Sequence, residues 1–159
     1  MTNQNPFIES LAIEAQALGF SLWGIAPAIA PRGYHDLLRW IEAGYAADMT
    51  YFEERIEAYG DLNRVLENVR SVIVLAFPYA TVSPTLPQGL QARVARYAWG
   101  TADYHDLIHL RLKRLKAFIA NTYPDAQSRG VVDSAPIMER EFAQLAGLGW
   151  TGKNTLLIN

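Results

Sequence analysis

Asp133 is the residue of this sequence that is best suited to handle a proton. It follows the apolar pair Val131 and Val132, which predicts the end of a buried strand, and it precedes Pro136, which suits the first turn of a helix. Burial would favour a protonated general acid at this junction, whereas the adjacent helix N-terminus would favour the carboxylate. A role as general acid and a role as loop cap, which Ser134 can also fill, therefore both stay open.

A glycine-rich stretch follows, in which residues 147–152, GLGWTG, match the dinucleotide-binding pattern GxGxxG. Phosphate-binding loops of this kind follow a strand and open a helix, whereas here a helical pattern precedes the glycines and strand-like residues 155–158 come after them. Asn154 also stands where a P-loop requires Ser or Thr. The pattern therefore predicts a helix C-cap at Gly147, or a close backbone approach to a large flat ligand. Lys153 and Asn154 offer a cation and an amide for a phosphate tail or for amide side chains.

Two histidines, His105 and His109, lie one helical turn apart, a spacing that suits two metal ligands. The sequence offers no evident third ligand, so we predict no metal site and expect partly exposed helix histidines. His105, beside Tyr104 at the helix start, is the one expected to face a pocket. Tyr97, Trp99 and Tyr104 could line a cofactor pocket, because aromatic rings stack on planar ligands, or they could pack in the core.

Apolar periodicity predicts the elements that must position these residues. Helical spacing occurs in Phe7–Leu18, in Leu37–Ile41 and in Met49–Val69, which Gly60 and Asp61 divide. Strands are predicted at Phe20–Ile25, Ser71–Tyr79, Arg93–Tyr97 and Gly130–Asp133. Ser71–Tyr79 is expected in the centre of a sheet because it is continuously apolar, and the Pro-rich segment Thr81–Gly89 is expected to be a mobile surface loop that could serve as a lid.

The longest predicted helix begins at the N-cap Asp103 and ends before Pro124. Its apolar stripe runs from Leu107 to Ile119, and its outer face carries a basic cluster. The cluster consists of Arg111, Lys113, Arg114 and Lys116. Such a face could contact nucleic-acid phosphates, although a solvated face with four cations is also ordinary.

Composition predicts one globular domain of α+β class over residues 1–159, with a central sheet flanked by helices. The chain has 159 residues, is 50% hydrophobic and carries a formal charge of −2, which gives no global attraction to nucleic acid or to an anionic membrane. Because it has no cysteine, it can hold no thiolate zinc site, cysteine nucleophile or iron–sulfur cluster. It shows no signal peptide and no apolar run near the roughly 20 residues of a membrane span, so we expect a cytoplasmic protein.

Two long segments, RYAWGTADYHDLIHLRLKRL and VVDSAPIMEREFAQLAGLGWTGKNTLLIN, resemble the N-terminal half of the epoxyqueuosine reductases. These are cobalamin-dependent enzymes that complete queuosine in transfer RNA. The resemblance covers most of the chain and is most specific between Arg96 and Asn159. Residues 59–62 depart from it, because an Arg-x-Asp-Pro type of segment is expected where this chain has YGDL.

The resemblance implies a domain similar to flavin-dependent nitroreductases and to cobalamin-processing proteins, with cobalamin bound in its base-off form. It implies a two-electron removal of the epoxide oxygen from a nucleoside in the tRNA anticodon region, with Asp133 as proton donor. The residues it assigns to contacts with cobalamin, besides Asp133, are Tyr97, His105, Ser134, Arg140, Lys153 and Asn154. The family's two iron–sulfur clusters lie in a following ferredoxin-like domain that this chain lacks. We therefore expect a monomer that needs external electrons and is inactive in isolation.

Two alternatives remain open from the sequence. One is a non-catalytic corrinoid or flavin carrier, because the same aromatic pocket would serve without an electron supply. The other is a tRNA-binding module that uses the basic cluster of the long helix.

Overall fold

The computed structural model describes residues 5–79, 89 and 95–159. The chain divides into two compact units, which are described separately. The first unit comprises Met1–Ser21 and Ala76–Val132, and the second comprises Leu22–Leu75 and Asp133–Asn159. Helices and strands both occur, so the predicted mixed class is confirmed. None of the helices in the described part of the chain combines the length and apolar character that a membrane span requires.

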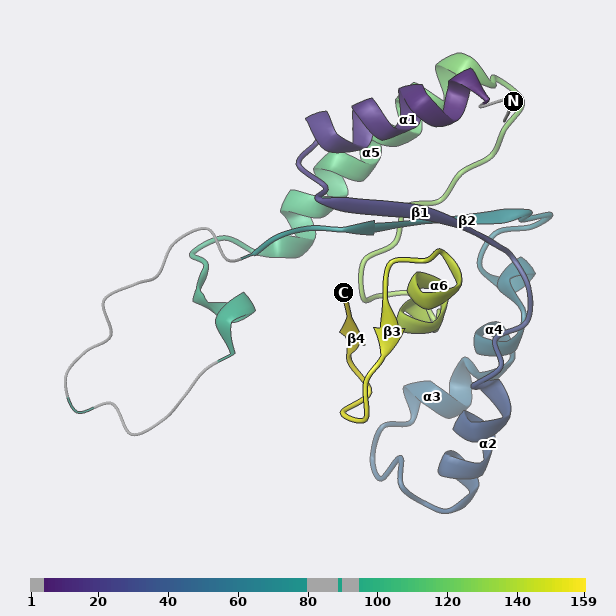
Figure 1. The fold of residues 1–159 in the computed structure, drawn as a ribbon. Helices are drawn as coiled ribbons and strands as arrows, with labels where there is room; N and C mark the ends of the chain where they lie inside the picture. The colour runs from purple at the N-terminus through teal and green to yellow at the C-terminus, as the bar shows by residue number, and fades with distance from the viewer. Residues whose placement is uncertain (1–4, 80–88, 90–94) are drawn as a thin grey trace. The chain divides into compact units, whose positions relative to one another are not determined.

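A pair of helices forms the first unit. α1 (Pro6–Ala17) begins at the N-cap Asn5, and α5 (Tyr104–Thr122) lies beside it (Figure 1). Leu11 of α1 is fully buried, and Leu115 of α5 is 3% exposed. The Phe7 ring stacks on Phe118 at 6.1 Å between centroids. Both helices begin and end close to where the sequence predicts them.

Arg111 ties α5 to the end of α1. Its Nε donates to the backbone oxygen of Leu18 at 2.7 Å, and its guanidinium lies 4.6 Å from the centroid of the Phe77 ring. The chain turns away after α1 at Gly19, whose φ of +85° favours glycine. Arg111 therefore has a structural role and does not belong to the solvent-facing basic cluster.

Residues 96–99 correct one predicted strand. Arg93–Tyr97 was expected to be extended, but Arg96–Trp99 forms a 3-10 helix, η2. The Arg96 guanidinium lies 5.4 Å from the centroid of the Trp99 ring, a contact three residues apart that the 3-10 turn brings together. Residues 93 and 94, like almost all of the predicted lid at residues 81–89, lie outside the described residues.

The second unit contains two small sheets. β1 (Leu22–Pro27) pairs with β2 (Ser71–Ala76), and β3 (Trp150–Thr151) pairs antiparallel with β4 (Leu157–Ile158). Hydrogen bonds from Ser21 N to Ala76 O and from Ala28 N to Arg70 O show that β1 and β2 also run antiparallel. Within the described residues β2 pairs with β1 alone, so its predicted place in the centre of a sheet is not found there.

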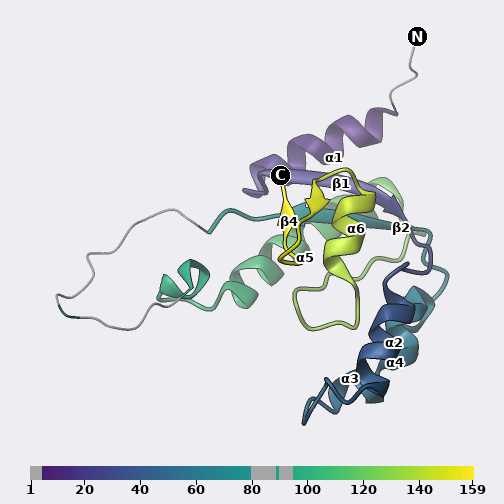
Figure 2. The same ribbon diagram turned by 60° about the horizontal axis from the view of Figure 1, so that its bottom comes forward.

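The core of the second unit forms around α6 (Glu139–Leu145), which packs on β1 and on the β3–β4 hairpin (Figure 2). Phe142 is fully buried and packs with Ala26 and Leu62. A Cβ on Gly24 would lie 2.5 Å from the backbone oxygen of Ala146, so only glycine lets β1 approach α6 this closely.

Short helices complete the second unit: α2 (Tyr34–Glu42), α3 (Tyr51–Glu54), α4 (Ile56–Gly60) and the 3-10 helix η1 (Leu62–Arg64). Aromatic rings hold them together, with Phe52 at 5.5 Å from Trp40 and 5.8 Å from Tyr59. The helical character of residues 49–69 and their division at Gly60 and Asp61 are therefore confirmed.

Residues 130–133 correct a second predicted strand, since they are irregular. A Cβ on Gly130 would lie 3.1 Å from the Cβ of Leu112, so this segment passes close over α5. Val132 is buried, at 8% exposure, although it belongs to no strand. Pro136 lies outside a helix as well, because α6 begins three residues later at Glu139.

Candidate functional site

The backbone of Asp133 adopts an unusual conformation. Its φ of +48° lies in the left-handed region, which aspartate tolerates better than most residues with a Cβ. Its N–H donates to Oε1 of Glu139 at 3.2 Å. One residue later, the backbone oxygen of Ser134 accepts from Nη1 of Arg55 at 3.3 Å. The loop that carries Asp133 is therefore held by side chains from two different elements.

Glu139, the first residue of α6, faces Asp133. Although much of the residue is exposed, burial of its carboxyl group raises the pKa of Glu139 above the ordinary value of 4.5, and the charge of Asp133 raises it further. A side-chain hydrogen bond with Asp133 acts in the same direction, whereas the Asp133 N–H and the nearby Arg140 oppose it. Two carboxyl groups in contact favour retention of a proton between them.

Arg140 connects the start of α6 with the turn between β3 and β4. Its Nη1 donates to the backbone oxygen of Thr155 at 3.0 Å and to the Thr155 hydroxyl at 3.3 Å. Oδ1 of Asn154 accepts from Leu156 N within the same turn, at 3.2 Å, and Lys153 is exposed there. Because Glu139 and Arg140 are consecutive, the Asp133 loop and this turn meet at the N-terminal end of α6.

The glycine-rich segment serves the chain's own packing. Gly147 ends α6 with φ +77° and donates to Gln144 O, as the predicted C-cap requires. A Cβ on Gly149 would lie 2.2 Å from the backbone oxygen of Ile158, so the close approach predicted there is to β4. The order of elements, a helix and then a hairpin, argues against a nucleotide-binding loop.

The other predicted cofactor residues lie in the first unit. Tyr97, at 59% exposure, meets Tyr104 edge-on at 6.3 Å, and Tyr104 stacks on His105 at 4.1 Å. The carboxylate of Asp103 caps α5 by accepting His105 N at 2.8 Å, and this hydrogen bond holds the pKa of Asp103 below its usual range. These residues form one exposed aromatic cluster at the start of α5.

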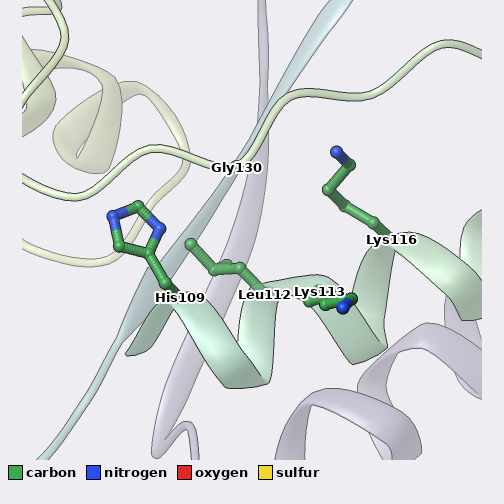
Figure 3. Close-up of a pocket in the computed structure, with 5 residues that line it drawn as sticks. All are labelled: His109, Leu112, Lys113, Lys116 and Gly130. Carbon is green, nitrogen blue, oxygen red and sulfur yellow. The ribbon is translucent and has the colours of Figure 1, made fainter. Parts of the chain in front are cut away.

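His109 lies one turn along α5 from His105 and has other neighbours. It lines a hollow of about 240 Å³ on α5, together with Leu112, Lys113, Lys116 and Gly130 (Figure 3). Within the described residues, no group of three or more His, Cys, Asp or Glu side chains is arranged to hold a metal ion. The hollow gathers two ammonium groups and an imidazole, donors that suit an oxyanion such as phosphate.

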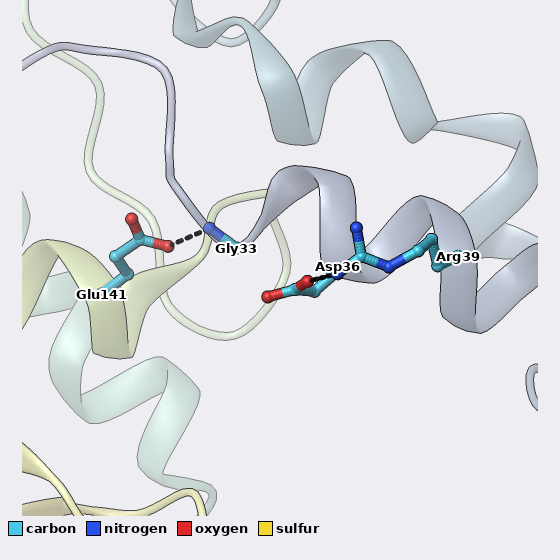
Figure 4. A network of polar contacts seen from close by, with 4 residues as sticks. All are labelled: Gly33, Asp36, Arg39 and Glu141. Atoms are coloured by element: carbon cyan, nitrogen blue, oxygen red, sulfur yellow. Dashed lines mark hydrogen bonds and ion pairs between the residues drawn. The ribbon is translucent and has the colours of Figure 1, made fainter.

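Glu141, which the sequence reasoning did not single out, also binds backbone N–H groups. Its carboxylate accepts from Gly33 N at 3.0 Å and from Arg32 N, just before α2 (Figure 4). An anionic acceptor at a helix N-terminus is stabilising, because the first N–H groups of a helix lack partners inside it. In the same figure Asp36 and Arg39 form an exposed ion pair along α2.

Comparison with known proteins gives a consistent family. Residues 60–134 match the family described as "Epoxyqueuosine reductase QueG, DUF1730". Over 155 residues the chain is 39% identical to the epoxyqueuosine reductase of Gloeobacter violaceus, covering 96% of this chain and 47% of that protein. The structure of epoxyqueuosine reductase from Streptococcus thermophilus is similar with a TM-score of 0.84 and 26% identity, over 98% of this chain and 42% of that one. Over nearly its whole length the chain is similar to the epoxyqueuosine reductases.

The fold is shared with a second structure, an epoxyqueuosine reductase with an epoxyqueuosine-modified tRNA-Tyr stem loop. Its TM-score is 0.82 at 24% identity, over 96% of this chain and 41% of that one. The chain spans about half the length of the curated epoxyqueuosine reductases it matches, 47% of the Gloeobacter violaceus protein.

Sequence reasoning singled out Asp133, Ser134 and Arg140 as candidates but did not identify the side chains that contact this loop. Arg55 lies 79 residues from Ser134 in the chain, and no local pattern connects the two. Glu139 did carry a signal: MEREF places two carboxylates in the first turn of the helix that follows the aspartate. Acidic residues at that position are typical of backbone N–H acceptors.

Proposed function

We propose that residues 1–159 are the N-terminal catalytic domain of an epoxyqueuosine reductase, which reduces epoxyqueuosine to queuosine in tRNA. The observation that carries this proposal, beside the similarity to these enzymes, is the Asp133 loop. Its aspartate is held in a left-handed conformation next to a second carboxyl group whose pKa is raised. A carboxyl pair that retains a proton suits a general acid.

The proposed reaction needs protons at one place. An epoxide that loses its oxygen as water consumes two electrons and two protons, and leaves a carbon–carbon double bond. The Asp133 carboxyl donates a proton to the departing oxygen, which avoids the formation of a free oxyanion. Cobalamin, when bound, supplies the reducing metal centre for this chemistry. The electrons come from an external donor, and the iron–sulfur clusters of the family belong to a further domain.

Each unit by itself carries side chains that suit part of a corrinoid. In the second unit Ser134, Arg140, Lys153 and Asn154 supply the hydroxyl, guanidinium, ammonium and amide groups that suit amide side chains and a phosphate tail. In the first unit the exposed rings of Tyr97 and His105 suit a flat ligand. We include in the proposal a nitroreductase-like, cobalamin-processing type of domain and a monomeric protein.

The test removes the acidic proton of Asp133 and keeps the conformation of its loop. Asparagine also tolerates the left-handed region, so Asp133→Asn in the complete gene product preserves the loop. We expect epoxide reduction, measured by mass spectrometry of nucleosides from treated tRNA, to fall by about 10²- to 10⁴-fold. Cob(II)alamin binding, followed by the visible spectrum, stays intact.

Asp125→Asn, a change at an exposed aspartate beyond the end of α5, is the matched control and keeps wild-type activity. Unchanged reduction by Asp133→Asn would remove this residue from the mechanism. Cobalamin binding by a wild-type protein that is supplied with electrons and reduces no epoxide would favour a non-catalytic corrinoid carrier.

A second candidate function is tRNA binding by α5, for which the hollow beside His109 is the specific observation. Lys113 and Lys116 line it, together with His109, Leu112 and Gly130 (Figure 3). Ammonium groups around a shallow depression suit phosphates of an RNA backbone, whose contacts are strong and dependent on salt.

This function predicts a change in salt dependence. The double variant Lys113→Ala/Lys116→Ala should weaken binding of a tRNA anticodon stem-loop and reduce the slope of log K against log salt by roughly 1 to 2. The control is Arg114→Ala, which removes one cation from α5 outside the hollow and should leave the slope within about 0.3 of the wild-type value. An identical loss in both variants would mean that the net charge of α5, and no particular site, attracts the RNA.

A further inference from the structure

The start of α6 places a carboxyl group where it contacts both the backbone and the side chain of Asp133. The Asp133 N–H donates to Oε1 of Glu139 at 3.2 Å, across a loop of five intervening residues. Within the loop, hydrogen bonds run from Ile137 N to Ala135 O and from Glu139 N to Ile137 O. The Glu139 contact closes this loop at the residue whose φ is +48°.

A left-handed conformation at a residue with a Cβ persists only where the surroundings determine it. On the C-terminal side of Asp133, Arg55 fixes the backbone oxygen of Ser134. On its N-terminal side, the amide is fixed by Glu139. Removal of the Glu139 acceptor would leave the loop held from one side.

The charged groups around Glu139 come from two elements. Asp133 faces it from the loop, and Arg140 lies next to it on α6. Burial and the Asp133 charge disfavour the ionised form of Glu139, and Arg140 opposes them. Arg55 is the further cation near the loop, through Ser134. Glu139 is therefore the carboxyl group that favours its protonated form beside Asp133.

We propose that Glu139 is a positioning residue for Asp133, which holds the aspartate loop in one conformation and shares a proton with the Asp133 carboxyl. This inference rests on the proposed function, because it assigns Glu139 a part in the proton donation by Asp133. Its role is to keep the donor oriented and to hold a proton beside it.

The experiment uses three variants in the complete gene product, Glu139→Ala, Glu139→Gln and Glu141→Gln. Glutamine at 139 keeps an acceptor for the Asp133 N–H but cannot ionise or share a proton. Glu141→Gln is the matched control, two residues along α6 and on the α2 side. The readouts are kcat and KM for epoxide reduction as a function of pH, and the NMR amide shift of Asp133.

We expect Glu139→Ala to lower kcat by on the order of 10- to 100-fold with little change in KM, because the donor loses its orientation. Glu139→Gln should restore most of the loss at low pH and move the upper limb of the pH–rate profile to lower pH. In the wild-type protein the Asp133 amide shift should follow the ionisation of Glu139, whose carboxyl group accepts from that amide. That component should be absent in Glu139→Gln, while the hydrogen-bonded amide shift remains.

The two proposals fail in different ways. Full activity of Asp133→Asn overturns the proposed function, whatever the behaviour of Glu139. A large loss in Asp133→Asn, combined with wild-type pH profiles in both Glu139 variants, overturns the positioning role alone. So does a loss in Glu139→Ala that leaves the pH profile and the Asp133 amide titration unchanged, because that pattern indicates a purely structural contact.

Discussion

α5 and α6 are held in opposite ways. α5 has 19 residues, of which only Leu115 is buried. Its N-cap Asp103 accepts a hydrogen bond from the backbone N–H of His105. α6 has seven residues, of which Phe142 and Ala143 are buried, and its N-cap Met138 makes no side-chain hydrogen bond. A helix as short as α6 is marginal alone and depends on tertiary packing. The difference teaches that the long helix leaves most of its surface exposed, whereas the short helix is buried in a core and holds the proposed catalytic loop.

The largest expected effect comes from removing the side chain at the centre of the core of the second unit. Phe142→Ala should lower the free energy of unfolding by about 3–5 kcal/mol, because Phe142 is fully buried between β1 and η1. Urea denaturation followed by circular dichroism measures it. Leu145→Ala, on the exposed side of the same helix at 36% exposure, should cost less than about 1 kcal/mol. Equal losses in the two variants would show that α6 lacks a distinct buried face.

The corresponding change in α5 should be smaller. Leu115→Ala removes the one buried side chain of that helix and should cost about 2–3 kcal/mol in the same denaturation experiment. Leu110→Ala is the control, since Leu110 is 62% exposed, and should stay within about 0.5 kcal/mol of the wild type. A loss with Leu115→Ala that exceeds that of Phe142→Ala would reverse the comparison.

Glu141 should contribute less than either core residue. Glu141→Ala leaves the N–H groups of Arg32 and Gly33 without their acceptor, which should cost about 1–2 kcal/mol at pH 7. The exposed Glu42 at the other end of α2 serves as the control, and Glu42→Ala should change stability by less than about 0.5 kcal/mol. Equal effects would mean that the Glu141 carboxylate does not stabilise the α2 terminus.

The smallest expected effect is the pH dependence that Glu139 adds to stability. Its pKa in the folded protein is raised above 4.5, so the folded state binds the proton more tightly than the unfolded state. The resulting stabilisation is complete below pH 4.5 and is lost as the pH rises through the raised pKa. Across that window, the stability of the wild type relative to Glu139→Gln should fall in urea titrations. A constant difference between them would show that Glu139 titrates alike in both states.

Most of the helices could be predicted because their signals are local. α1, α2 and α5 each have an apolar spacing and a capping or terminating residue, such as Gly19, Gly44 or Asp103, within the same short segment. The strands expected at 93–97 and 130–133 were wrong for the same reason. Short apolar runs carry no information about their neighbours, and Val132 is buried although residues 130–133 form no strand.

The sequence by itself determined the resemblance to the epoxyqueuosine reductases, the long helix with its basic residues and the C-cap at Gly147, and it led us to propose a role for Asp133. Only the tertiary structure decided what surrounds that aspartate. Glu139 reaches it across a loop, and Arg55 reaches Ser134 over 79 residues, because loop closure and packing place them there. Tertiary contacts also show that Arg111 differs in role from the lysines of the hollow. Arg111 contacts the backbone oxygen of Leu18 and the ring of Phe77, whereas Lys113 and Lys116 line the hollow. The sequence gives the type of each side chain. Its hydrogen-bond partner depends on which chain segments pack together in the core.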